Sequence, residues 1–158
     1  MRTWFRVLLT VGVVGLATVG SAQDPPVWRT LPEALAIAGA SEVPALVYVQ
    51  AAWCGPCRQL ERETFADPDV QARLAQVALA RLTVDDRDRQ LRVGPYRLSE
   101  AEWAERLGAV GTPTLIALAP DGSVLGRHTG FLPPDGILPL LDAALADVAR
   151  TDLRSSDR

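Results

Sequence analysis

The sequence predicts an α/β fold, in which a sheet lies between helices. A continuous apolar run, residues 45–50, is typical of a strand covered on both faces. Segments of helix-forming composition alternate with such runs and begin at capping sequences. Two short strands, residues 114–118 and 124–129, flank a Pro-Asp-Gly turn and form a hairpin pattern. The order is helix, strand, helix, strand, helix, hairpin, helix, which also fits other α/β sheets.

Composition favours one compact domain that carries a targeting segment. The chain has 158 residues, of which 48% are hydrophobic and 22% are charged. Residues 1–22 contain two arginines, then a run of 13 apolar residues (7–19) and then small residues before Gln23. This pattern predicts a cleaved signal peptide. The alternative is an N-terminal membrane anchor, although 13 residues are short of the ~20 that span a bilayer. The predicted domain is then 23–150.

The first elements of this domain follow from capping and turn residues. Thr30 and Glu33 form a capping-box pattern, which predicts a helix over residues 31–38. The buried strand of residues 45–50 comes next. A second helix is expected to begin at the two cysteines and to extend over residues 54–64.

The remaining elements are predicted in the same way. The pair Asp67-Pro68 suits the N-cap and first residue of a further helix, and residues 77–84 are predicted as the next strand. A capping box opens the helix of residues 99–107. The last helix is expected over residues 133–148, and residues 151–158 are predicted to form a flexible tail.

The chain contains two cysteines, Cys54 and Cys57, at a strand-to-helix junction. The C-x-x-C spacing allows them to form and open a small disulfide ring. The alternative, half of a zinc site, needs two further ligands, and the only histidine is His128, so we expect no metal. Cys54 is predicted to lie exposed at the helix N-terminus, which favours its thiolate, and Cys57 to be more covered and to act as the resolving thiol. Gly55 and Pro56 suit the tight start of the helix.

The residues Trp53, Cys54, Gly55, Pro56 and Cys57 resemble the active-site sequence of thioredoxins, and Thr112-Pro113 is similar to the pair that contains that family's cis-proline. The resemblance covers residues 31–148. It implies a thioredoxin fold, which has a central mixed sheet flanked by helices, here with an extended loop before the third main helix. It also implies a thiol-disulfide oxidoreductase whose redox centre is the Cys54–Cys57 disulfide and which needs no other cofactor.

The resemblance also implies roles for other side chains. Thr112 would lie against the sulfurs and pair with the substrate backbone, next to cis-Pro113. Trp53 would pack beside the cysteines, unless it is a core aromatic. Arg81 resembles the lysine that thioredoxins carry near the cysteines, and the alternative is a strand arginine whose head faces solvent.

Tyr48 departs from the family pattern, because thioredoxins usually carry a buried aspartate six residues before the first cysteine. A tyrosine with an ordinary pKa of ~10 is no base near neutral pH. Glu61, seven residues after Cys54, is a candidate replacement, because the C-terminal domain of the transmembrane disulfide reductor has a glutamate at that offset. The alternative is that Glu61 is a solvated helix residue. Residues 63–70 are similar to that domain and to thioredoxin-like proteins of sulfur-oxidation operons, which indicates a periplasmic subgroup.

Residues 85–98 are the least thioredoxin-like part of the chain. Alternating charges and a Gly-Pro pair predict an exposed loop of 14 residues, longer than usual connections. We hypothesise that it lies near the cis-proline end of the sheet and helps to select the partner. The alternative is a solvated insertion without a role.

These features predict a monomeric periplasmic protein-disulfide reductase. Its expected partners are disulfide-bearing periplasmic proteins and a transmembrane electron donor. The acidic balance of 19 acidic against 16 basic residues gives no reason to expect nucleic-acid binding. The alternatives are a disulfide oxidase or isomerase and a non-catalytic thioredoxin-fold chaperone or assembly module.

Overall fold

The computed structural model describes residues 26–156, so the predicted signal peptide lies outside the described residues. Its elements are, in chain order, α1 (Leu31–Ser41), β1 (Ala45–Gln50), α2 (Gly55–Gln59), a π-helical turn η1 (Leu60–Thr64), α3 (Pro68–Leu74), β2 (Ala78–Thr83), β3 (Gln90–Val93), β4 (Tyr96–Ser99), α4 (Glu100–Arg106), β5 (Thr114–Leu118), β6 (Val124–Thr129) and α5 (Pro134–Ser156). None of the helices between residues 26 and 156 combines the length and the apolar character of a membrane span.

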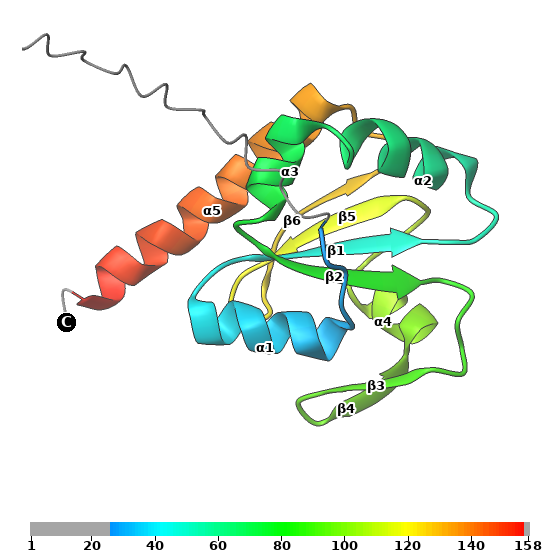
Figure 1. Ribbon diagram of the computed structural model, residues 1–158. Coiled ribbons are helices and arrows are strands. Elements are labelled where there is room, and N and C mark those ends of the chain that lie inside the picture. The colour runs from blue at the N-terminus through cyan, green and yellow to red at the C-terminus, as the bar shows by residue number, and fades with distance from the viewer. Residues whose placement is uncertain (1–25, 157–158) are drawn as a thin grey trace, which may run out of the picture.

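The central sheet is mixed, as predicted. Its strand order is β2-β1-β5-β6, with β1 parallel to β2 and antiparallel to β5, and with β5 antiparallel to β6. Helices α2, α3 and α5 cover one face, and α1 and α4 lie on the other (Figure 1). The first five residues of β1 are buried, because helices cover this strand on both sides.

Two apolar clusters fill the space on either side of the sheet. Alternate residues of β1 divide between them, so that Val47 faces the cluster with α1 and α4, whereas Tyr48 faces the cluster with α2, α3 and α5. The second cluster contains both cysteines. The sheet therefore places the cysteines on one face and leaves α1 and α4 on the other.

The predicted capping sequences start the helices. The Thr30 N–H donates to Glu33 Oε2 at 3.0 Å, and the Ser99 N–H donates to Glu102 Oε2 at 2.7 Å. Asp67 Oδ1 accepts from the backbone N–H groups of the first turn of α3. These contacts confirm the three predicted helix starts.

Two predicted helix ends are wrong. Helix α1 continues to Ser41, because the chain leaves it at Glu42, which adopts a left-handed conformation with φ of 53°. Helix α5 continues to Ser156, so residues 151–156 of the predicted tail are helical. No glycine or proline interrupts that segment, and Asp147 anchors it by pairing with Arg150 and accepting the Thr151 hydroxyl at its carbonyl oxygen.

The predicted loop of residues 85–98 is also wrong, because β3 and β4 form an antiparallel hairpin within it. Gly94 has φ of 56° in its turn. Leu91 is buried on the inner side of the hairpin, and Trp103 Nε1 donates to its carbonyl oxygen at 3.1 Å. The hairpin thus extends the α1 and α4 layer, on the face of the sheet opposite α2 (Figure 1).

Candidate active site

Cys54 and Cys57 form a disulfide at the start of α2. Cys54 is the N-cap of this helix, and the backbone N–H of Cys57 donates to Cys54 Sγ at 3.1 Å. The same N–H and the positive end of the helix would stabilise a thiolate at Cys54 after reduction. The structure therefore places Cys54 at the helix N-terminus, as the sequence predicted.

The predicted difference in exposure between the cysteines is wrong for this disulfide form. Both residues are 2% exposed, because both pack in the apolar cluster that includes Ala51 and Leu60. The assignment of Cys54 as the attacking thiol therefore depends on its place at the helix N-terminus and not on its exposed surface.

Gly55 and Pro56 form the first turn of α2, as predicted. Trp53 comes just before the disulfide and is 69% exposed, so the alternative of a core aromatic is wrong. A large apolar side chain in this position presents area that a protein partner can cover.

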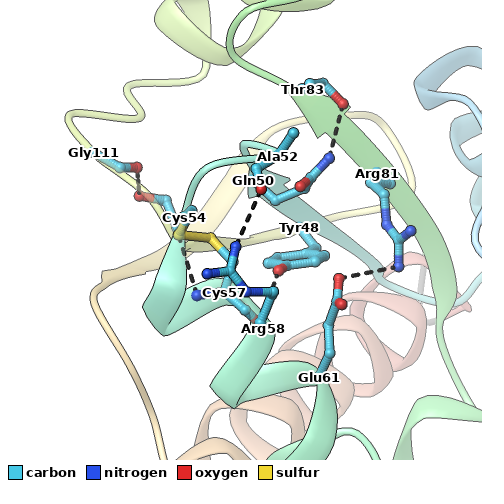
Figure 2. The surroundings of a disulfide bond; sticks show 11 residues. Tyr48, Gln50, Ala52, Cys54, Cys57, Arg58, Glu61, Arg81, Thr83 and Gly111 are labelled. Atoms are coloured by element: carbon cyan, nitrogen blue, oxygen red, sulfur yellow. Dashed lines mark hydrogen bonds and ion pairs between the residues drawn. A yellow bond between two sulfur atoms is a disulfide. The ribbon is translucent and has the colours of Figure 1, made fainter.

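Arg58, which the sequence analysis did not single out, closes the turn around the disulfide. Its Nη1 donates to the carbonyl oxygen of Ala52 at 3.2 Å, which joins the start of α2 to the residues before it (Figure 2). A basic residue directly after the C-x-x-C sequence is the signal that could have identified it.

The peptide bond between Thr112 and Pro113 is cis, as the resemblance implied. Pro113 is buried and Thr112 half-buried. The turn that contains them is held by the Thr114 hydroxyl, which donates to the Gly111 carbonyl oxygen at 2.7 Å. Figure 2 includes Gly111 among the surroundings of the disulfide.

A buried tyrosine lies beneath the disulfide. The Tyr48 hydroxyl donates to the carbonyl oxygen of Cys57 at 3.4 Å (Figure 2). Burial raises the pKa of Tyr48, and the negative charge of Glu61 raises it further. Tyr48 therefore remains neutral where the resemblance leads one to expect a carboxylate.

The structure brings Glu61 and Arg81 together beside Tyr48. Arg81 Nη2 lies 3.6 Å from Glu61 Oε1, and each side chain is 39% exposed (Figure 2). The Arg81 guanidinium lies over the rings of Trp28 and Tyr48, 5.4 and 5.6 Å from their centroids. Arg81 Nε is buried without a hydrogen-bond partner among the described residues. Arg81 thus faces a carboxylate and two rings, which excludes the alternative of a side chain directed only to solvent.

Trp28 is a second residue that the sequence analysis missed. It lies before α1, where Arg29 pairs with Ala80 at the edge of β2. Its ring contacts those of Tyr48 and Phe65, with centroids 5.5 and 5.1 Å apart. A lone tryptophan in a proline-containing lead segment gives no periodic signal, so the sequence could not place it.

Comparisons with known proteins agree with this geometry. The sequence model of the family described as "Thioredoxin-like domain" matches residues 31–145. The thiol:disulfide interchange protein DsbD of Yersinia enterocolitica is 30% identical over 105 residues, which are 65% of this chain and 17% of that protein. DsbD of Escherichia coli K12 is 29% identical over 99 residues, or 61% of this chain and 16% of that protein. The chain thus spans less than a fifth of the length of these curated relatives.

Solved structures give the same fold. A thioredoxin from Thermus thermophilus superposes with a TM-score of 0.62 at 29% identity, covering 75% of this chain and 86% of that one. The C-terminal domain of Neisseria meningitidis DsbD in its reduced form superposes with a TM-score of 0.56 at 17% identity, covering 71% of this chain and 91% of that one. The second similarity concerns the fold alone. The chain belongs to the thioredoxin-like domain family, and with its disulfide between Cys54 and Cys57 it is a thiol-disulfide oxidoreductase.

Proposed function

We propose that this oxidoreductase reduces protein disulfides in the bacterial periplasm. The observation that carries the proposal is the Cys54 sulfur at the N-terminus of α2, where the Cys57 N–H donates to it. The dipeptide Gly55-Pro56 between the cysteines, which resembles that of reducing thioredoxins, supports this direction. The proposed location follows from the predicted signal peptide and from the similarity to DsbD proteins.

The reaction transfers two electrons from the reduced protein to its client. The Cys54 thiolate attacks one sulfur of the client disulfide, which forms a mixed disulfide and releases the other client sulfur as a thiolate that takes a proton. The Cys57 thiol then loses its proton, and its sulfur attacks Cys54. This second step forms the Cys54–Cys57 disulfide and releases the second client thiol. We propose that a membrane-bound dithiol donor returns the protein to its reduced form by the reverse exchange.

Surrounding residues would assist these steps. Thr112, beside cis-Pro113, would pair with the client backbone, and exposed Trp53 would cover an apolar part of the client surface. Because Tyr48 stays neutral, Glu61 is the proposed acceptor of the Cys57 proton, and Arg81, 3.6 Å from its carboxylate, would position it beside Tyr48.

Two measurements test the proposed direction. The reduced protein should turn over insulin disulfides, and equilibration with dithiol buffers should give a potential near that of thioredoxins, on the order of −270 mV. A potential near ~−120 mV, together with a mainly oxidised site in cells, would instead indicate an oxidase. For the location, a tagged chain should be recovered in the periplasmic fraction, and recovery in the cytoplasm would contradict the proposal.

A further inference from the structure

The outer side of the β3–β4 hairpin carries two arginines directly opposite each other. Arg92 pairs with Arg97 in the register of the hairpin, and both are exposed. Directly opposite residues of an antiparallel pair point to the same side, with Cβ atoms ~5 Å apart. None of the ion pairs within residues 26–156 includes either of them.

Two neighbouring arginines, Arg87 and Arg89, face carboxylates, which distinguishes them from Arg92 and Arg97. Arg89 lies 3.4 Å from a carboxylate oxygen of buried Glu100, and Arg87 lies 4.0 Å from Glu105. The ten residues 89–98 contain three arginines and no acidic residue, in a chain whose net charge is −3. The outer face of the hairpin is therefore a local positive surface on an acidic protein.

The backbone that carries these two arginines is held against the core. Its inner side is fixed by buried Leu91, whose carbonyl oxygen accepts from Trp103, and by the contact between Arg89 and Glu100. Like charges held opposite each other on a two-stranded sheet destabilise it. An anionic partner across both arginines would remove that repulsion and gain charge-assisted hydrogen bonds.

We propose that Arg92 and Arg97 form a docking site for an acidic, extended segment of a partner protein. Two carboxylates of such a segment would each pair with one guanidinium. A short acidic peptide fits better than a nucleic acid, because the overall negative charge of the chain would repel a long polyanion.

This docking site lies away from the redox centre. The hairpin belongs to the α1 and α4 layer, whereas the disulfide lies on the α2 side of the sheet (Figure 1). A partner held at the hairpin would leave the disulfide free to react and would raise the local concentration of the thiols of that partner. The inference is independent of the direction of electron flow.

Binding of a fluorescein-labelled peptide of alternating glutamate and threonine to the oxidised protein tests the site without any redox turnover. R92E/R97E should weaken binding by about tenfold or more, and added salt should weaken wild-type binding. R62E/R127E changes the net charge equally at two exposed arginines elsewhere and should retain wild-type affinity. Equal affinity of all three proteins, or no binding by the wild type at low salt, would overturn the proposal.

A single substitution separates docking from stability. R97E places opposite charges across the hairpin, so it should raise the Tm while it weakens peptide binding. A purely structural role for the two arginines would instead give a lower Tm with no change in peptide affinity, and that result would also overturn the proposal.

Discussion

The Tyr48 hydroxyl and the Cys57 carbonyl oxygen, 3.4 Å apart, join the buried centre of β1 to the helix that carries the redox cysteines. The contact places a neutral donor beneath the disulfide. Because burial raises the pKa of Tyr48, the hydroxyl keeps its proton at any pH near neutrality. The proton that Cys57 releases must therefore be accepted by another group.

Tyr48→Phe tests whether the hydroxyl has only a structural role. The substitution keeps the ring, and the Cys57 carbonyl oxygen still accepts from the Leu60 N–H, so we expect a loss of about 0.5–1.5 kcal/mol in the free energy of unfolding. Insulin reduction should stay near the wild-type rate. Denaturant unfolding and turnover are the two measurements, and a large fall in turnover with unchanged stability would place Tyr48 in proton transfer.

Glu61→Gln tests the proposed proton acceptor. The amide keeps the shape of the side chain but cannot accept the proton, so the resolving step should slow by about tenfold to 100-fold. This factor is at the low end of the usual contribution of acid–base catalysis or below it, because solvent reaches this half-exposed site. Rapid mixing of the reduced variant with a model disulfide measures that step. Glu63→Gln is the matched control, because Glu63 is exposed and, within residues 26–156, its carboxylate accepts a hydrogen bond only from the Gln59 side chain. Equal rates in both variants would remove Glu61 from the mechanism.

Glu100→Ala should destabilise the anchor of the hairpin. The Glu100 carboxylate is 4% exposed and accepts from the Thr83 N–H at 2.9 Å, so its loss leaves that donor unpaired at a cost of about 1–3 kcal/mol. Glu105→Ala removes an exposed carboxylate of the same helix and should change stability by less than about 0.5 kcal/mol. Chemical denaturation compares the two, and equal effects would contradict the anchoring role of Glu100.

The capping boxes predict a specific acid sensitivity. Hydrogen bonds from the Ser99 N–H and hydroxyl hold the pKa of Glu102 below its usual 4.5, and Thr30 does the same for Glu33. Between the lowered folded pKa values and the usual value of 4.5, the unfolded state therefore binds more protons than the folded state. The stabilisation from the two capping boxes is complete above pH 4.5 and is lost as the pH falls through the folded pKa values. The Tm of E33Q/E102Q should fall less steeply in this range than that of the wild type. Identical slopes would contradict the capping contribution.

The sequence predicted the parts of the fold that local signals determine. The capping boxes, the buried strand β1 and the C-x-x-C junction each depend on residues close together in the chain. The hairpin of β3 and β4 was missed because its strands have four residues each and are rich in arginine. Its stability depends on Trp103 and Glu100, which follow it in the sequence and give no local signal.

The candidate site shows the same division. The motif identified the two cysteines and the cis-proline, whereas the contact between Arg81 and Glu61 and the stacking of Trp28 depend on tertiary packing. The burial of Cys54 was also mispredicted, because a helix N-terminus is usually exposed but here it packs into the apolar cluster.

The most direct test of the mechanism is the pKa of each thiol in the reduced protein. Alkylation rates of Cys54 and Cys57 as a function of pH, with the two sites separated by mass spectrometry, give both values. The helix N-terminus predicts that Cys54 titrates well below the ordinary thiol pKa of ~8.5 and reacts before Cys57. A Cys54 that titrates near that ordinary value and reacts no faster than Cys57 would contradict the account.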